Sequence, residues 1–494
     1  MKDGLAAIYE RYLRFETHSR IGGRLLAGVP VWRLMRMWLF CSHLLPRLVD
    51  IGAAHPDLRG GREGTKPPRG TRVRLKALKD RLLYSPSPLS IRRDILFALK
   101  PRQMRMSDGR EVAQMLDFFI TKLNSSSAVL ELRKPGETYP PRPDWQRVYH
   151  LDGYDGRYRA FVRSRPDVKG EARRFAERMR SELADAFGVE LDLDLLTRLV
   201  TRHVCMQLFY GPLFRDWLRK LKVRCVVTSV NYSTVNQILC ASAHDEGIPV
   251  VELQHGTVYP AHPAYNLPER DERYSPDYLF AWGRHWAEQT RNYALRGTLC
   301  TGYPALEHLL THNPPQHRDG PRRIVFISQG TIGAELSRRA VELRRALPAE
   351  RYAIVYKLHP NETNTWRELY PWLSDSGVEV VTSSQISVYM LFQKASAVVG
   401  VYSTAVIESL MWNLKGYVFT DLPGGDTMTP FLQSGVLEGV DSVRGLVGRL
   451  ESGADGRGVG VDGSRFWQRD SVAAIVTALE EIVRNGLLSE TSFK

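Results

Sequence analysis

The spacing of apolar and polar residues divides the chain into three parts. In residues 1–88 the apolar positions recur at helical spacing and predict helices at 5–15 and 31–45. A stretch rich in Gly, Pro and charged residues at 52–72 predicts a surface loop or linker. From residue 89 onward, short apolar runs alternate with helical segments, which is typical of parallel sheets built from strand–helix–strand units.

Two such series follow one another, separated by a proline-rich linker at 313–321. The first predicts strands at 94–99, 128–132, 224–228, 250–253, 278–281 and 299–301, and helices at 111–123, 170–222 (with a break at Gly188), 234–246 and 284–294. The second predicts strands at 324–327, 353–358, 378–381, 397–401 and 416–420, and helices at 334–347 and 404–412. We therefore expect an α/β protein with a basic helical extension (1–88) and two Rossmann-like doubly wound parallel-sheet domains (89–312 and 313–494). A ligand cleft between the two domains is typical of such a plan.

The net charge of +14 is concentrated near the N-terminus. Residues 1–100 hold 20 Lys and Arg against 8 Asp and Glu, so the remaining residues contribute only +2. This distribution indicates a partner for one surface, such as anionic lipid headgroups or an acidic polymer, and argues against a nucleic-acid-binding fold. An arginine-rich coding bias that aids solubility explains the same numbers, and both interpretations stay open at this point.

Cysteine usage and hydropathy indicate a cytoplasmic protein. The five cysteines include no CxxC pair, which favours a reducing compartment and argues against a cysteine zinc site. The first ten residues lack the apolar core of a secretory signal, and no uncharged run approaches the roughly 18–20 residues of a membrane span.

Residues 28–45 are the nearest candidate for membrane contact. One interpretation is a helix in the membrane interface, with the arginines facing outward and the apolar residues in lipid (Trp32, Met35, Trp38 and Leu39 against Arg33 and Arg36). The other, which we prefer, is a helix packed on the neighbouring domain.

A histidine follows a predicted strand of the first domain. The segment Gln254-His255-Gly256-Thr257 comes directly after strand 250–253, so His255 lies at the carboxyl edge of the sheet, where ligands bind in open parallel sheets. A neutral imidazole there can take a proton from an attacking hydroxyl. The alternative is a structural histidine bonded to a backbone carbonyl at a tight turn. His262 is a weaker second candidate.

Two segments of the second domain carry groups that suit a phosphate. Lys357 and His359 alternate on an emerging strand, so both point the same way and together can neutralise a pyrophosphate or a departing nucleoside phosphate. Ser403 and Thr404 follow strand 397–401 and open a helix, where hydroxyls and backbone N–H groups can bind phosphate. Plain N-capping by Ser403 is compatible with that role.

Further candidates are weaker. Ser328-Gln329-Gly330-Thr331 follows the first strand of the second domain and precedes a helix, but lacks the spacing of a known phosphate loop. Glu408 either accepts ribose hydroxyls or belongs to a solvated helix face. Asp192 and Asp194 form a DxD pair ahead of a Leu-rich helix, so we interpret them as capping residues and not as metal ligands.

Taken in order, these motifs resemble those of GT-B glycosyltransferases of bacterial surface polysaccharide synthesis. The group includes capsule polysaccharide transferases, sialyl- and polysialyltransferases, and teichoic acid glycerophosphotransferases. His359-Pro360 and Ser403-Thr404 are similar to the family's HP dipeptide and Ser-Ser/Thr turn, and Gln254-His255-Gly256-Thr257 is similar to a WHGT segment with Gln in place of Trp. Gly302-Tyr303-Pro304 looks like the GxP that ends the first domain in many members. Asp245-Glu246-Gly247 departs from the sialyltransferase pattern, because it precedes its strand.

The resemblance, which covers about residues 90–425, implies an inverting, metal-independent transferase. A sugar or alditol phosphate would pass from a nucleotide-activated donor, CMP- or CDP-linked among the options, to a glycan or lipid-linked glycan acceptor. His255 would be the base, while Lys357, His359, Pro360, Ser403, Thr404, Glu408, Ser328 and Gly330 would bind the donor. We expect no cofactor, no metal, no nucleic acid, and peripheral contact with the inner face of the membrane. The alternatives are a nucleotide-sugar 2-epimerase, which needs paired carboxylates, and a non-catalytic scaffold for polysaccharide assembly.

Overall fold

The computed structural model describes residues 4–48, 85–86, 91–99, 103–105, 111–131, 147–258, 261–316, 320–382, 386–452 and 465–493. The predicted linker at 52–72 lies outside these residues, as do the basic residues Arg74, Lys76 and Lys79. Contacts divide the chain into two compact units. The described residues of 10–48, 60–304 and 466–494 form what we call the first unit, and those of 1–9, 49–59 and 305–465 form the second unit.

The first unit contains a seven-stranded parallel sheet, as the apolar runs predict. Its strand order is β5-β4-β1-β6-β7-β8-β9. The direction of the strand order reverses at β1, because β4 pairs with one edge of β1 and β6 with the other. The strands are β1 (Ile95–Ala98), β4 (Ser127–Glu131), β5 (Arg147–His150), β6 (Cys225–Thr228), β7 (Val250–Leu253), β8 (Tyr278–Ala281) and β9 (Gly297–Cys300).

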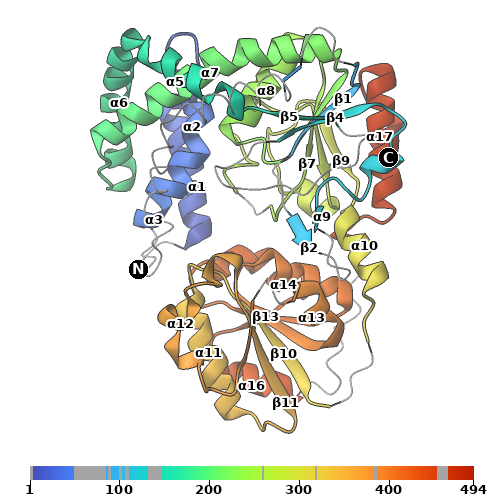
Figure 1. Cartoon of the computed structure of the whole chain (residues 1–494). Coiled ribbons are helices and arrows are strands. Elements are labelled where there is room, and N and C mark those ends of the chain that lie inside the picture. The colour runs from blue at the N-terminus through green and yellow to red at the C-terminus, as the bar shows by residue number, and fades with distance from the viewer. Residues whose placement is uncertain are drawn as a thin grey trace, which may run out of the picture. The chain divides into compact units, whose positions relative to one another are not determined.

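Helices cover both faces of this sheet. The long α7 (Leu193–Leu221) and α8 (Thr234–Asp245) pack on each other along one face, and α17 (Ser471–Asn485) lies on the other (Figure 1). Two further helices, α5 (Asp155–Arg163) and α6 (Pro166–Phe187), precede α7. Gly188 ends α6 with φ 65°, which is the predicted break in the helical stretch. Asp192 caps α7 by accepting from the backbone N–H of Leu195 at 2.6 Å, which is its predicted role.

Two helix predictions in the first unit are wrong. Residues 111–123 begin with β3 (Glu111–Ala113), which pairs antiparallel with β2 (Gln103–Arg105), and continue as turns. The apolar residues that suggested a helix, including Leu116 and Phe119, are buried from these turns instead. The predicted helix 284–294 is only α9 (Arg284–Ala287), and the chain then leaves the helix to bury Tyr293.

The second unit contains a six-stranded parallel sheet of order β12-β11-β10-β13-β14-β15. Here the order reverses at β10, with α11 and α16 on one face and α13 and α14 on the other (Figure 1). The chain therefore has two Rossmann-like α/β domains. The strands are β10 (Arg322–Ile327), β11 (Tyr352–Lys357), β12 (Glu379–Val381), β13 (Ala395–Gly400), β14 (Lys415–Phe419) and β15 (Glu438–Val440). The helices are α10 (Pro304–His312), α11 (Gly333–Ala346), α12 (Trp366–Leu369), α13 (Val388–Lys394), α14 (Thr404–Glu408), α15 (Thr429–Gln433) and α16 (Val443–Ser452).

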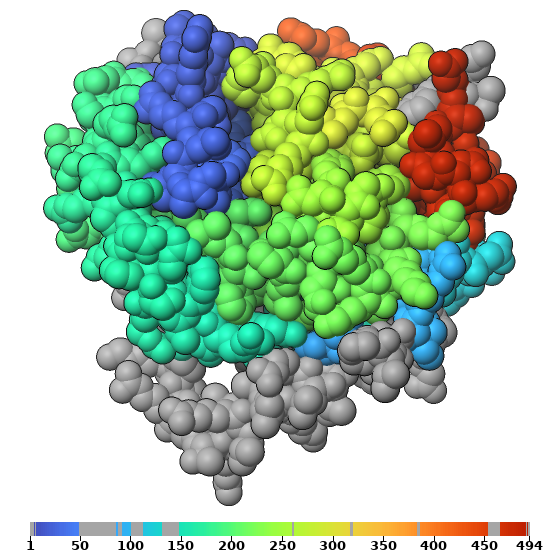
Figure 2. Space-filling view, turned by 90° about the horizontal axis from the view of Figure 1, so that it is seen from above, coloured from blue at the N-terminus to red at the C-terminus, as the bar shows by residue number. Residues whose placement is uncertain are grey.

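From Glu10 onward, the N-terminal helices belong to the first unit. They are α1 (Leu5–Ser19), α2 (Val31–Leu39), a π-helical turn (Phe40–Leu44) and α3 (Leu45–Leu48). Figure 2 shows this blue segment against the green α6 and α7, and the Arg11 Nε donates to the Ala186 carbonyl at 3.0 Å. Trp32, Met35 and Leu39 are buried in protein.

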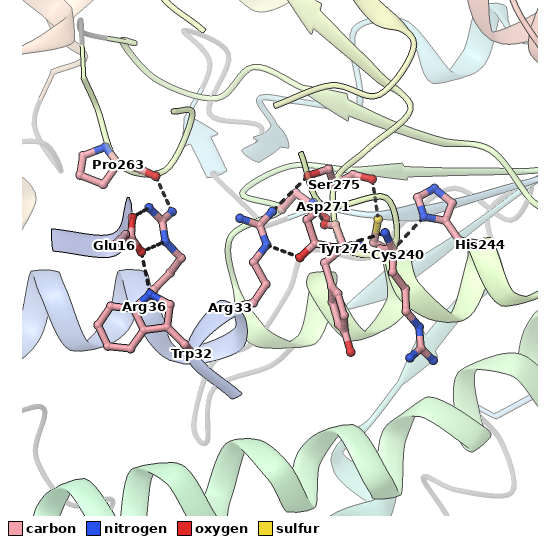
Figure 3. Close-up of polar contacts among 12 residues, drawn as sticks. Glu16, Trp32, Arg33, Arg36, Cys240, His244, Pro263, Asp271, Tyr274 and Ser275 are labelled. Atoms are coloured by element: carbon pink, nitrogen blue, oxygen red, sulfur yellow. Dashed lines mark hydrogen bonds and ion pairs between the residues drawn. The ribbon is translucent and has the colours of Figure 1, made fainter. Parts of the chain in front are cut away.

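The arginines of α2 are also buried, which contradicts the membrane-interface interpretation of 28–45. Arg36 forms an ion pair with Glu16 and donates to the Pro263 carbonyl, while Trp32 donates to the same carboxylate at 2.7 Å (Figure 3). Arg33 lies 3.4 Å from Asp271 and donates to Ser275. A helix in the membrane interface would require both arginines to face outward. Because they are buried, the interpretation we preferred, a helix packed on the neighbouring domain, is confirmed. Among the described residues, every helix is too short or too polar to cross a bilayer.

The C-terminal segment does not stay with the second sheet, although we assigned 313–494 to one domain. Its residues 466–494 belong to the first unit. Phe466 accepts through its carbonyl from the Trp286 indole at 2.7 Å, and Gln468 donates to the Trp282 carbonyl at 2.7 Å. These contacts join residues far apart in the sequence, so the local pattern of apolar and polar residues cannot predict them.

Candidate functional site

His255 lies just beyond the carboxyl end of β7, as predicted. Gln254 fixes the backbone there, because its side chain accepts from the Trp282 N–H and donates to the Gly256 carbonyl, both at 2.8 Å. The imidazole is partly exposed, with 20 % of its side chain accessible. One of these hydrogen bonds connects the turn to the residue after β8 and the other lies within the turn, and together they hold the His255 ring at the edge of the sheet.

Both nitrogens of His255 have tyrosine partners. Nε2 lies 3.0 Å from the hydroxyl of Tyr232, which comes from the loop after β6, and Nδ1 lies 2.9 Å from the hydroxyl of Tyr265. Two side-chain hydroxyls therefore contact the ring, one at each nitrogen. Neither tyrosine was a candidate in the sequence, because α8 and β7 separate Tyr232 from His255 and a loop separates His255 from Tyr265.

A buried carboxylate lies behind this pair. Glu252, on β7, is fully buried and accepts from the backbone N–H of Asn231 at 3.2 Å and from the hydroxyl of Tyr293. Tyr265 donates to it at 3.4 Å. Burial raises the pKa of Glu252 to about 7, although its hydrogen bonds act in the opposite direction. Sequence reasoning missed this residue; the signal was a single carboxylate within the otherwise apolar strand Val-Val-Glu-Leu.

A cavity of about 390 Å³ adjoins the Tyr232 side of the site. Its lining is mainly apolar and comes from the end of α2 and the π-helical turn after it, from α7, from the loop after β6 and from the start of α8. The residues are Met37, Trp38, Cys41, Ser42, Arg202, His203, Met206, Tyr232, Ser233, Thr234 and Val235. Tyr232 therefore both lines this cavity and contacts His255 Nε2.

In the second unit, the candidate residues gather at the carboxyl edge of three adjacent strands. The loops after β10 and β13 flank the point where the strand order reverses, the position at which open parallel sheets bind ligands. Gln329 accepts from the Tyr402 N–H at 3.2 Å, and Thr331 and Tyr402 share a hydroxyl–hydroxyl hydrogen bond. The structure thus joins the weak 328–331 candidate to the 402–404 turn.

Lys357 and His359 end the neighbouring strand β11. Lys357 is largely buried, and desolvation lowers the pKa of its ammonium to about 8, with Glu362 acting in the opposite direction. His359 and Glu362 form a reciprocal capping box over the 3-10 turn Pro360–Glu362. The His359 Nδ1 accepts from the Asn361 N–H at 3.3 Å, and Glu362 accepts from the His359 N–H at 2.7 Å. The Nδ1 bond fixes the orientation of this ring.

Glu362 is the buried centre of this edge. Its other oxygen accepts from Ser328 at 2.9 Å and from Tyr370 at 2.6 Å. Ser328 also accepts from Tyr356, so its hydroxyl already has two protein partners. A phosphate contact by residues 328–330 would therefore involve backbone N–H groups, including that of Gly330. Sequence reasoning missed Glu362, although its place three residues after His359 is the spacing of a capping box.

The last candidates lie after β13. Ser403 caps α14 by accepting from the Ala405 N–H at 3.3 Å, and Thr404 is the first residue of that helix. With five residues, α14 has a small dipole, so any anion binding here depends on individual N–H groups and hydroxyls. Glu408 is buried and accepts from Tyr389 at 2.9 Å, so it does not belong to a solvated face. Its contact with ribose stays a prediction.

Other sequence candidates have structural contacts. His262 accepts from the Ala264 N–H at 3.1 Å, and burial lowers its pKa to about 4. Asp245 forms ion pairs with Arg215 and Arg273 at the surface of α8. Within the described ranges, no group of three or more His, Cys, Asp or Glu side chains is arranged to hold a metal ion.

Comparisons with known proteins give matches among solved structures only. Neither a family model nor a curated protein matches the sequence. UDP-GlcNAc 2-epimerase from Methanocaldococcus jannaschii, in complex with UDP-GlcNAc and UDP, has 11% identity over 78% of this chain and 99% of its own, with a TM-score of 0.47. A putative UDP-N-acetylglucosamine 2-epimerase from Listeria monocytogenes has 10% identity over 79% and 97%, with a TM-score of 0.48. A variant of the wall teichoic acid polymerase TagF, soaked with CDPG, has 11% identity over 84% and 98%, with a TM-score of 0.44. Because these identities and TM-scores are low, the matches support no further argument, and the assignment of the fold rests on the strand orders of the two sheets.

Proposed function

We propose that this chain is a GT-B-type glycosyltransferase that moves a sugar, or an alditol phosphate, from a nucleotide-activated donor to a hydroxyl of a bacterial surface glycan. The observation that carries the proposal is the convergence of Lys357, His359 and the tied loops 328–331 and 402–404 at the switch point of the second sheet. A cation, a ring N–H and several backbone N–H groups at one sheet edge suit the phosphate of a nucleotide.

The chemical roles follow from the two sheet edges. The Tyr232 hydroxyl contacts Nε2 of His255 in the free protein, and the acceptor hydroxyl takes its place. For a sugar, the acceptor oxygen forms a bond to the anomeric carbon while the bond from that carbon to the donor phosphate breaks. For an alditol phosphate, the acceptor oxygen bonds to the phosphorus of the transferred group while the bond from that phosphorus to the departing nucleotide breaks. The proton passes to Nε2, and the electron pair leaves with the nucleotide, whose negative charge Lys357 and His359 stabilise. If the transferred unit is a sugar, direct displacement with a single base inverts the anomeric carbon.

The burial of three carboxylates argues against the epimerase alternative. Such a reaction needs carboxylates that reach the sugar as acid and base. Three carboxylates of the described residues lie beside or among the candidates: Glu252 is 3.9 Å from His255, Glu362 accepts from the His359 N–H, and Glu408 is in α14. All three are buried, and each accepts from a tyrosine hydroxyl.

Thermal-shift measurements with CMP, CDP, UDP and GDP test the donor site. We expect one nucleotide to raise the melting temperature, because a ligand that binds only the native state stabilises it. His255→Ala should retain this shift but lose on the order of 100-fold in the slow release of nucleotide from the matching nucleotide-sugar with water as acceptor. No shift with any of the four nucleotides would contradict the donor site. Exchange of the sugar C2 hydrogen with solvent deuterium, without release of nucleotide, would indicate the epimerase, and binding without either reaction would indicate the scaffold.

A further inference from the structure

Glu252 is a carboxylate where the strand pattern calls for an apolar residue. It lies between Val251 and Leu253 on a strand whose four residues are all buried, and it is fully buried itself. A carboxylate in such a place is costly unless hydrogen bonds compensate for lost water. Two of its side-chain hydrogen bonds come from loops that also contact His255, which indicates a role beyond packing.

The first connection passes through Tyr265. Its hydroxyl lies 3.4 Å from the Glu252 Oε1 and 2.9 Å from the His255 Nδ1, while Oε1 and Nδ1 are themselves 3.9 Å apart. A phenol has one proton. If that proton goes to the carboxylate, the phenol oxygen accepts from Nδ1–H, and Nε2 of the imidazole keeps its lone pair.

The second connection passes through the loop after β6. The Asn231 N–H donates to Glu252 at 3.2 Å, and the preceding residue, Val230, has φ 56°. A β-branched residue in the left-handed region is strained and persists only where its surroundings hold it. The same loop carries Tyr232, which contacts Nε2. One carboxylate thus fixes groups on both sides of the imidazole.

We propose that Glu252 is a positioning residue that holds His255, through Tyr265, in the tautomer with its proton on Nδ1. The proposal rests on the proposed function, because it assigns Nε2 as the atom that takes the acceptor proton. It also gives the imidazolium formed in that step a carboxylate at 3.9 Å.

The neighbours of Glu252 support this orientation. Tyr293 bonds the carboxylate from the segment after α9, and Cys240 of α8 is close enough for the two groups to affect each other electrostatically. Burial raises the pKa of both Tyr265 and Tyr293 well above the ordinary range, so both remain proton donors at neutral pH. Glu252 is therefore the acceptor to which the two phenols point.

The test measures the reactivity of His255 and requires neither donor nor acceptor. The full-length protein is treated with diethyl pyrocarbonate across pH 5–9, and modification of each histidine is resolved by tandem mass spectrometry. Only the neutral ring reacts. We expect Glu252→Gln to move the pH midpoint of His255 modification down, because the imidazolium loses its carboxylate. The shift should be smaller than one unit, because Glu252, with a pKa of about 7, is ionised over only the upper part of this pH range. Tyr265→Phe should move it in the same direction, and Glu252→Asp should restore part of the shift.

The controls separate this role from a general loss of structure. His244 pairs with Asp277 at 3.0 Å, and its hydrogen-bond partners are Asp277 and the Arg273 carbonyl, none of which is changed in these variants, so its midpoint should stay constant. An unchanged His255 midpoint in Tyr265→Phe with native circular dichroism would overturn the proposal, even if Glu252→Gln fails to fold. Because the measurement uses no nucleotide, failure of donor binding and failure of this proposal are distinguishable.

Discussion

Gly333 shows how a single residue permits the arrangement of the donor edge. It begins α11, and a Cβ at this position would overlap the Glu362 carboxylate and lie 2.8 Å from the Tyr370 Cζ. Both neighbours are buried and hydrogen-bonded to each other, so neither can move cheaply. The absence of a side chain therefore allows the Glu362 cluster to close.

Gly333→Ala should accordingly destabilise the protein by about 1–3 kcal/mol, as overpacking of a filled site usually does. Gly170→Ala is the matched control, since Gly170 lies in α6 with no atom within 4 Å of its added Cβ. The control should gain about 0.5–1 kcal/mol from better helix propensity. Urea unfolding of the two variants measures the difference. Equal urea midpoints would show that Glu362 and Tyr370 can move to accommodate the added methyl group.

Lys357 illustrates a residue whose proposed function costs stability. Its pKa in the folded protein, about 8, lies below its ordinary value of 10.5, so between these pH values the unfolded chain binds more protons. Stability due to this group therefore rises with pH across that window and is lowest below pH 8.

We expect Lys357→Met to stabilise the free protein at pH 7 by on the order of 2 kcal/mol, with the gain vanishing above pH 10.5. The same variant should lose the nucleotide-dependent thermal shift. Melting curves at pH 7 and pH 10.5, with and without the nucleotide that binds the wild type, measure both effects. A destabilised Lys357→Met protein at pH 7 would mean that the ammonium has compensating partners.

At the scale of elements, α2 depends on a buried ion pair. Arg36 and Glu16 are 3 % and 4 % exposed, and Arg36 also bonds Pro263, two residues before Tyr265. Removing the cation leaves a buried carboxylate without its partner, which typically costs 3–5 kcal/mol.

We therefore expect Arg36→Met to destabilise the first unit by about that amount, and Glu16→Gln/Arg36→Met to recover a substantial part. Arg14→Met is the control, because Arg14 and Glu10 form an exposed pair whose loss should cost under about 0.5 kcal/mol. Chemical unfolding gives the free energies. A double variant no more stable than Arg36→Met would show that shape, and not charge, limits this site.

The elements that the sequence predicts well are those with strong local signals. The strand 278–281 has its predicted bounds because four consecutive apolar residues are buried on both faces of the sheet. The predicted helix 284–294 stops at Ala287 because the chain turns to bring Tyr293 to Glu252, a contact across 41 positions of sequence. For the same reason the positions of His255 and Lys357 were predictable from the strands before them. Their partners Tyr265 and Glu362 required the folded structure or, for Glu362, attention to capping.

At the scale of the whole molecule, the return of the C-terminal segment to the first unit depends on a close approach at Gly302. This glycine has φ 82°, and a Cβ would overlap the Gln468 carbonyl and lie 2.7 Å from the Ser471 Cβ at the start of α17. The neighbouring Tyr303 stacks on Trp282, the residue whose carbonyl binds Gln468. The glycine of the GxP segment is thus the place where the end of the chain meets the first sheet.

Gly302→Ala should destabilise the protein in two ways, through backbone strain at a positive φ and through steric overlap of the added Cβ. The same substitution at Gly188 measures the strain alone. Gly188 also has a positive φ, of 65°, but open space around its Cβ, so Gly188→Ala should cost only the backbone strain of about 1–2 kcal/mol. Gly302→Ala adds overlap with backbone atoms that cannot change rotamer, and should cost about 1–3 kcal/mol more. Hydrogen exchange locates the effect: amides of α17 should exchange faster in Gly302→Ala and at the wild-type rate in Gly188→Ala. Equal destabilisation with α17 protected in both would mean that the segment shifts to accommodate the methyl group. The close approach would then be a consequence of the docking of α17 and not a condition for it.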